Sequence, residues 1–233
     1  MGSDEESGDG GEDDESGQES QEEGAESEMA LVRGAHLSPD APNVDVYVDG
    51  EAELEDVAYR DVSDYMEFEP GTYDVEVTEA GDDEEVIYED SLEVEAGTYT
   101  LAAVGEDGED NEPLDVEVFE DDTSDPGDDA RLSVVHASPD APTVDVTDDE
   151  SGDALVEDLS FGGRESLEAA SGDYTVGVRP ADDDGDPVAT FDVSLESGTV
   201  YTAFAVGYLE PDDAPVDEDF DLEVVDDSAG LGE

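Results

Sequence analysis

The residue types that could carry out chemistry lie in one short motif, which occurs twice. The first copy is His-Leu-Ser-Pro-Asp-Ala-Pro, beginning at His36, and the second is His-Ala-Ser-Pro-Asp-Ala-Pro, beginning at His136, 100 residues later. Histidine, serine and aspartate are the three residue types of a hydrolase triad, in which the histidine accepts the serine proton and the aspartate orients the ring. The motif therefore raises a catalytic hypothesis, which must be weighed against a structural one and against a small ligand site.

The spacing within the motif favours a rigid turn between strands. The serine lies only two residues after the histidine and precedes a proline, and the chain contains no Gly-x-Ser-x-Gly nucleophile elbow. The prolines fix φ and remove backbone donors, while the serine and aspartate can bond nearby amides. We expect the histidine ring to be buried and to bond a backbone carbonyl. The motif residues are His36, Ser38, Pro39, Asp40, Pro42, His136, Ser138, Pro139, Asp140 and Pro142.

The similarity between the two halves of the chain extends well beyond this motif. Glu55-Asp56-Val57-Ala58-Tyr59 corresponds to Glu157-Asp158-Leu159-Ser160-Phe161, and Ala103-Val104-Gly105 corresponds to Ala205-Val206-Gly207. Ordered matches over the length of a domain indicate a duplication. Within each copy, apolar residues alternate with polar ones and Gly-containing turns separate the runs, which predicts seven or eight short strands.

A glycine followed closely by a tyrosine opens several of the predicted strands. A tyrosine at such a position can pack its ring and bond its hydroxyl back to the chain, as in the tyrosine corner of immunoglobulin-like domains. The strand-entry residues are Gly71, Tyr73, Gly97, Tyr99, Gly172, Tyr174, Gly198 and Tyr201. The sequence therefore predicts an all-β protein with two tandem immunoglobulin-like β-sandwich domains, with a barrel as the alternative.

The motif, the Val-Asp-Val that follows it, the Gly-x-Tyr pairs and the Ala-Val-Gly near the end of each copy resemble domain-of-unknown-function family 4397. The resemblance covers about residues 30–227. It implies a tandem pair of domains, of the type found in secreted or cell-surface proteins of bacteria and haloarchaea, and it implies no activity. Tyr47-Val48-Asp49-Gly50 becomes Thr147-Asp148-Asp149-Glu150 in the second copy, so a turn there is expected to differ.

The charge of the chain points to a halophile. The formal net charge is −71, lysine is absent, and the bases are five arginines. Such a chain repels itself in dilute buffer, whereas the Debye length of roughly 3 Å in molar salt removes most of the repulsion. Five scattered arginines cannot bind a nucleic-acid backbone or an anionic membrane. No apolar run is long enough to span a membrane, and the absence of cysteine excludes disulfides and thiol chemistry.

Acidic runs give only a weak indication of calcium binding. Residues 106–110, 148–150 and 182–186 are rich in carboxylates, which Ca²⁺ prefers, but they lack the EF-hand spacing. In a chain this acidic, solvated turns are the favoured interpretation, and no cofactor is expected. Paired carboxylates for glycoside hydrolysis cannot be selected from 76 acids.

Composition also predicts how the chain is divided. Residues 1–28 are expected to form a disordered acidic spacer, because they have almost no apolar side chains to bury. We expect sandwich domains over 29–122 and 130–227, a linker over 123–129, and a tail over 228–233. The short linker predicts two domains placed end to end.

These observations predict a non-catalytic protein with a structural or adhesive role at the cell surface or outside the cell. Its expected partner is a protein or glycan of the surface. No signal peptide is visible after Met1, so this expectation requires an export signal upstream of Met1, which a lipid anchor there would also supply; a cytoplasmic location is the alternative. A module that binds a glycan, a peptide or Ca²⁺ through its loops is the second hypothesis, and a hydrolase is the least favoured.

Overall fold

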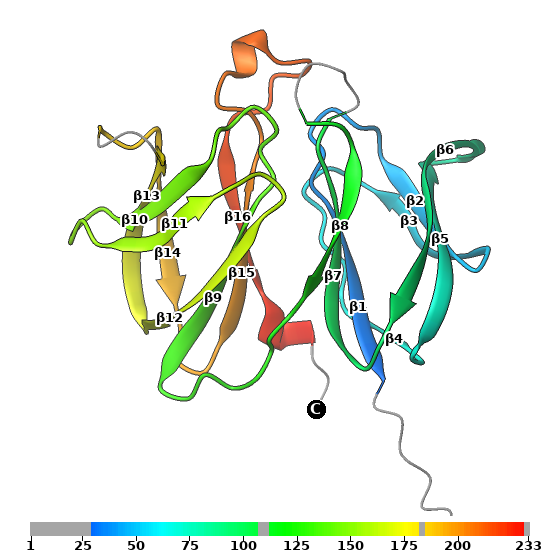
Figure 1. Ribbon diagram of the computed structural model, residues 1–233, viewed down its shortest axis with the longest axis horizontal. Helices are drawn as coiled ribbons and strands as arrows, with labels where there is room; N and C mark the ends of the chain where they lie inside the picture. The colour runs from blue at the N-terminus through cyan, green and yellow to red at the C-terminus, as the bar shows by residue number, and fades with distance from the viewer. Residues whose placement is uncertain (1–28, 107–111, 182–184, 231–233) are drawn as a thin grey trace, which may run out of the picture.

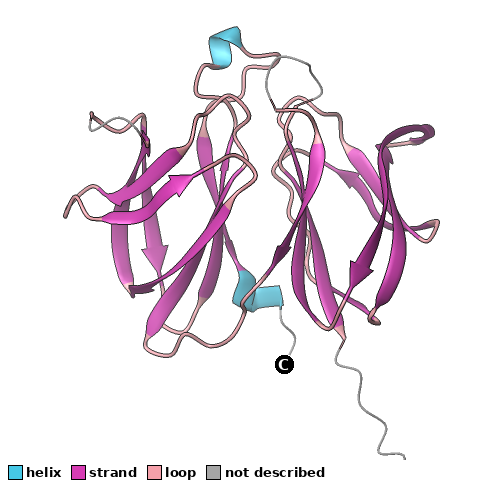
Figure 2. Cartoon of the chain, in the orientation of Figure 1, coloured by secondary structure: helices cyan, strands magenta, loops and turns pink. Residues whose placement is uncertain are grey.

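The computed structural model describes residues 29–106, 112–181 and 185–230. The expected spacer over 1–28 and the last three residues of the expected tail lie outside the described residues. Strands dominate the described residues, and Figure 2 shows only two short helical turns, η1 (Pro211–Asp213) and η2 (Asp227–Gly230). None of the helices in these ranges is long and apolar enough to cross a membrane.

Each repeat contributes eight strands. Those of the first repeat are β1 (Ala30–His36), β2 (Val44–Val48), β3 (Glu51–Val57), β4 (Met66–Phe68), β5 (Gly71–Glu79), β6 (Asp82–Val94), β7 (Gly97–Val104) and β8 (Asp115–Glu120). Those of the second are β9 (Asp129–His136), β10 (Val144–Asp148), β11 (Ala154–Leu159), β12 (Arg164–Ala170), β13 (Gly172–Pro180), β14 (Ala189–Leu195), β15 (Val200–Val206) and β16 (Asp221–Asp226).

The strands of each repeat form two four-stranded sheets, which confirms the predicted pair of β-sandwiches. In the first repeat the sheets have the orders β4-β1-β7-β8 and β3-β2-β5-β6. The second repeat has the same topology, with β12-β9-β15-β16 and β11-β10-β13-β14. Most neighbouring strands are antiparallel, but β1 pairs with β7, and β9 with β15, in parallel at the centre of a sheet.

The two sandwiches lie side by side, not end to end as the short linker suggested. In Figure 1 the sheet that contains β1 and β7 faces the sheet that contains β9 and β15. Buried apolar residues of both repeats form one cluster between these sheets, which we call the inter-repeat seam: Ala35, Leu37, Ala102, Val104, Val135, Ala137, Phe204 and Val206. The linker allows this arrangement because it only has to connect the adjacent ends of β8 and β9.

The seam explains why one strand departs from the alternating pattern. Every residue of β15, Val-Tyr-Thr-Ala-Phe-Ala-Val, is buried. One face of this strand packs on the core of its own sandwich through Tyr201 and Ala203, and the other packs in the seam through Phe204 and Val206. A strand covered on both faces is a continuous apolar run.

Candidate functional site

Each motif histidine is buried at the end of the first strand of its repeat. The His36 ring is 2 % exposed and its Nε2 lies 3.0 Å from the Pro42 carbonyl oxygen; His136 is fully buried and its Nε2 lies 3.1 Å from the Pro142 carbonyl oxygen. Because a carbonyl only accepts, Nε2 carries the proton and donates in both rings. Burial lowers the pKa of both histidines, although the bonds to the proline carbonyls oppose this shift. Both rings are therefore neutral near pH 7.

In the second repeat, the serine hydroxyl does not donate to the histidine as in a triad; only the Ser138 backbone amide donates to the ring, at 3.4 Å from His136 Nδ1. The Ser138 hydroxyl donates to Asp140 at 3.2 Å, while Asp140 accepts the backbone amides of Leu209 and Glu210, each at 2.9 Å. Among the described residues, the Ser38 hydroxyl is buried without a hydrogen-bond partner. The aspartate of the second repeat thus ties the motif turn to the loop that follows β15.

The motif also shapes the inter-repeat seam. The residue after each histidine, Leu37 or Ala137, is fully buried in the seam. Its amide donates to a carbonyl of the central parallel strand, Ala103 or Ala205, at 2.8 Å in both repeats. The rigid turn therefore fixes the position along the strands at which this side chain packs between the repeats.

The aspartate of Val-Asp-Val has a role that the sequence analysis did not assign. Asp45 accepts the amide of Asp56 at 2.7 Å, and Asp145 accepts the amide of Asp158 at 2.8 Å. Asp56 and Asp158 have positive φ values of 56° and 57°, a conformation that aspartate tolerates better than most residues. Register shifts between β2 and β3 and between β10 and β11 mark a β-bulge beside these residues. The repeated Glu-Asp after the motif was the signal that could have revealed it.

The strand-entry tyrosines differ in the hydrogen bonds that their hydroxyls form. Tyr73 donates to the Glu69 carbonyl and Tyr174 to the Ala170 carbonyl, both at 2.6 Å. The Tyr201 hydroxyl instead accepts the Glu196 amide at 3.2 Å. Tyr99 packs its ring over Gly97, where an added Cβ would lie 3.0 Å from its hydroxyl oxygen.

The structure gathers arginines that the sequence shows as scattered. Arg33 is 2 % exposed and reaches from the first repeat to the buried Asp227 of the second, at 2.6 Å from Nη1 to Oδ1. Its remaining donors bond to the Thr100 hydroxyl at 2.9 Å and to the Thr202 hydroxyl at 3.3 Å. Burial raises the pKa of Asp227, while the Arg33 charge opposes that shift.

Three further arginines pair across the two repeats. Arg164 of the second repeat lies 2.6 Å from the buried Asp121, at the position that corresponds to Asp227. Arg60 lies 2.7 Å from Asp221. Arg131 lies 3.0 Å from Asp122, just after β8. Arg131 also pairs within the second repeat, with Glu168 at 3.4 Å, and Arg179 pairs there with Asp149 at 3.3 Å. Four of the five positive side chains thus pair across the two repeats.

The acidic runs have no metal site in the part of the chain that is described. No group of three or more histidine or acidic side chains within residues 29–106, 112–181 and 185–230 is arranged to hold a metal ion. The run over 148–150 forms a turn in which Asp148 accepts the Glu150 amide at 2.9 Å. The runs over 106–110 and 182–186 lie partly outside the described residues.

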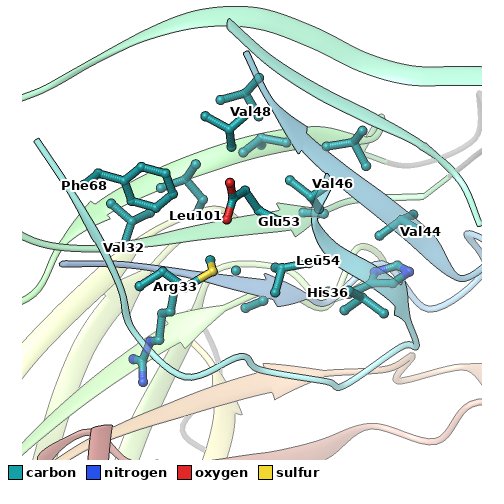
Figure 3. A pocket seen from close by; sticks show the side chains of 18 residues that line it. Val32, Arg33, His36, Val44, Val46, Val48, Glu53, Leu54, Phe68 and Leu101 are labelled. Carbon is teal, nitrogen blue, oxygen red and sulfur yellow. The ribbon is translucent and has the colours of Figure 1, made fainter. Parts of the chain in front are cut away.

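A cavity in the first sandwich distinguishes the two repeats. It has a volume of about 70 Å³ and opens to solvent between the two sheets, whereas the equivalent space in the second sandwich is about 20 Å³. Side chains from both sheets line it, and Figure 3 shows the Glu53 carboxylate among Val46, Phe68 and Leu101. No pattern in the sequence indicates this cavity, because it depends on positions at which the two repeats differ.

The chain belongs to the family described as "Domain of unknown function (DUF4397)", which matches residues 30–147 and 130–231. These two matches correspond to a tandem pair of family domains. No curated protein matches the chain.

Solved structures with similar features are distant. The Bacillus anthracis TIE protein is 13 % identical with a TM-score of 0.25; the match covers 78 % of this chain, which spans only 34 % of that one. A family 26 carbohydrate-binding module of Eubacterium rectale Amy13K, in complex with maltoheptaose, is 10 % identical with a TM-score of 0.26, covering 84 % of this chain and 96 % of its own. A candidate cell adhesion protein of Bacteroides fragilis NCTC 9343 is 9 % identical with a TM-score of 0.21, and the match covers 84 % of this chain and 97 % of that one. Scores this low carry no functional argument.

Proposed function

We propose that this chain is a non-catalytic module of the surface or exterior of a halophilic cell, in which two sandwiches act as one rigid body. The observation that carries the proposal is the inter-repeat seam. It combines eight buried apolar residues with a fully buried ion pair, Arg33–Asp227. A unit of this kind can hold a partner protein or a glycan at a fixed distance and orientation, which is a structural or adhesive role.

The geometry of the motif supports a non-catalytic role. His36 and His136 donate from Nε2 to a proline carbonyl, so this nitrogen is not free to accept a serine proton. The Ser138 hydroxyl donates to Asp140 and not to His136. The residues that suggested a triad are instead used to build the turn that enters the seam.

The distribution of charge supports a role in concentrated salt. Four of the five arginines are used across the seam, which leaves the outer surfaces acidic. Salt screens exposed charges strongly and buried pairs weakly. Added salt therefore removes repulsion between surface carboxylates while it preserves the Arg33–Asp227 attraction.

Circular dichroism across a KCl series tests the salt requirement. We expect folded β structure above about 1 M KCl and loss of structure on dilution, because repulsion is then unscreened. A fold that persists in millimolar buffer would contradict the halophilic proposal. Sucrose at matched water activity is the control, since it does not screen charge.

Antibody binding to intact cells of the source organism tests the proposed location. We expect equal binding to intact and to gently permeabilised cells. Binding that requires permeabilisation would place the protein in the cytoplasm and end the surface proposal. Antibodies are preferable to amine-reactive labels, because the chain has no lysine.

A further inference from the structure

Two differences between the sandwiches lie at or next to the lining of the cavity in the first repeat. Glu53 on β3 occupies the position of Leu155, and Asp90 on β6 occupies the position of Phe191, which pairs with Val176 as Asp90 pairs with Val75. Leu155 and Phe191 both pack against the core of the second repeat. The first repeat thus has carboxylates where the second has apolar side chains that close the sandwich.

The interior of the cavity is apolar. Residues that line it include Val46, Met66, Phe68, Leu101 and Val116, drawn from both sheets. An apolar cavity of this kind stays dry or takes up apolar groups, and a cavity of about 150 Å³ accommodates the six carbons of benzene. By that measure, a cavity of 70 Å³ accommodates about three carbons.

Glu53 supplies the polar feature of the opening. Glu53 is exposed, and its carboxylate lies beside the lining side chains in Figure 3. Within the described ranges it has no hydrogen bond or ion pair. An unpaired carboxylate beside an apolar slot favours a ligand with an alkyl group and an adjacent positive charge. Each arginine of the chain already has an acidic partner, so none of them neutralises Glu53.

We infer that the first repeat binds a short alkylammonium ion, with the alkyl group inside the cavity and the ammonium at Glu53. This orientation distinguishes a free amine from a lysine side chain of a partner, which would have to bury its ammonium in apolar surroundings at high cost. The second repeat, whose equivalent cavity of about 20 Å³ holds less than one carbon by the same measure, does not bind it. This inference goes beyond the proposed surface role and depends on neither the seam nor the location of the protein.

Methyl NMR in 3 M KCl tests the site directly. The chain has three methionines, and ¹³C-methyl labelling places one probe in the cavity lining, Met66, and one outside it, Met29. We expect n-propylammonium chloride to shift the Met66 signal saturably and to leave Met29 unmoved. The neutral isostere 1-propanol should bind about 1.5-fold more weakly, which is the low end of the range for an exposed ion pair, because molar salt screens it.

Three variants complete the test. Glu53→Gln should remove the preference for propylammonium over propanol, and Glu53→Leu, which introduces the residue type of the second repeat, should abolish the Met66 shift for both. Glu55→Gln, on the same strand but outside the lining, should change nothing. A Met66 signal that does not move, or that moves equally in Glu53→Leu, would overturn the inference. Either result would leave the proposed surface role untouched.

Discussion

The two repeats share their topology, their motif turn and their parallel central strands, yet their large and small apolar residues lie at different positions. In the core, Gly34 pairs with Leu101 in the first repeat, while Val134 pairs with Ala203 in the second. In the seam, Leu37 and Ala102 of the first repeat correspond to Ala137 and Phe204 of the second. Large and small residues have exchanged places, so the two faces differ where they meet.

This difference shows that the repeats have diverged into complementary partners. A contact between two identical faces would bring large residues against large ones, whereas Phe204 can occupy space left by Ala102 in a mixed contact. The ion pairs show the same asymmetry, because Asp227 is paired by Arg33 from β1 and Asp121 by Arg164 from β12. The second repeat has a closed core, and the first has an open one.

The largest expected effect comes from truncation of the seam. Phe204→Ala should lower the free energy of unfolding by about 4 kcal/mol, because it removes a fully buried aromatic ring from a contact between both repeats. Urea unfolding in constant 3 M KCl measures this. Phe191→Ala, on the outer sheet and only partly buried, is the matched control and should cost less. Equal losses would mean that the seam contributes no more than an ordinary core position.

Removal of the buried Arg33 should have the second-largest effect on the free energy of unfolding. Arg33→Ala should cost about 3 kcal/mol, the lower end of the range for a broken buried pair. The loss of stability is moderated because burial raises the pKa of Asp227. Without Arg33, this carboxyl can take up a proton and avoid a buried unpaired charge. Urea unfolding in 3 M KCl provides the measurement. Arg33→Met should recover part of the loss, and Arg179→Ala, whose pair is partly exposed, should cost at most about 1 kcal/mol.

The buried histidines predict a pH dependence with a defined sign. Burial holds their pKa values in the folded chain below the ordinary histidine value of 6.5, so the unfolded chain binds more protons as the pH falls below 6.5. Stability is therefore fully present above pH 6.5 and is lost on acidification, by up to about 1.4 kcal/mol per pH unit for each histidine. Urea unfolding between pH 7.5 and 5.5 should show this slope, and His136→Asn should halve it. An unchanged slope in that variant would assign the pH dependence to other groups.

The smallest expected effect concerns the open core. Asp90→Phe, which introduces the residue type of the second repeat, should stabilise the chain by about 1 kcal/mol by covering the apolar cavity of the first repeat. Thermal unfolding in 3 M KCl measures this, and Glu89→Phe, on the neighbouring position of the same strand, is the control. Destabilisation by Asp90→Phe alone would show that the cavity is not open on this side.

The sequence was sufficient to predict the strands, the duplication and the buried histidines, because each depends on local alternation or on a motif repeated in order. It was insufficient for the side-by-side packing, since the burial of Phe204 on a second face becomes visible only when β15 is placed between two sheets. The pairing of Arg33 with Asp227 spans 194 residues and leaves no local pattern. The cavity was missed because it depends on differences such as Glu53 against Leu155, which a search for similarity passes over.

Differential scanning calorimetry of the full chain in 3 M KCl tests the central claim, that the seam makes the two repeats one cooperative unit. We predict a single transition whose calorimetric and van't Hoff enthalpies agree. We also predict that Phe204→Ala lowers the temperature of the whole transition. Two transitions in the unaltered chain, with only one displaced by Phe204→Ala, would show that the repeats unfold independently and would contradict the account.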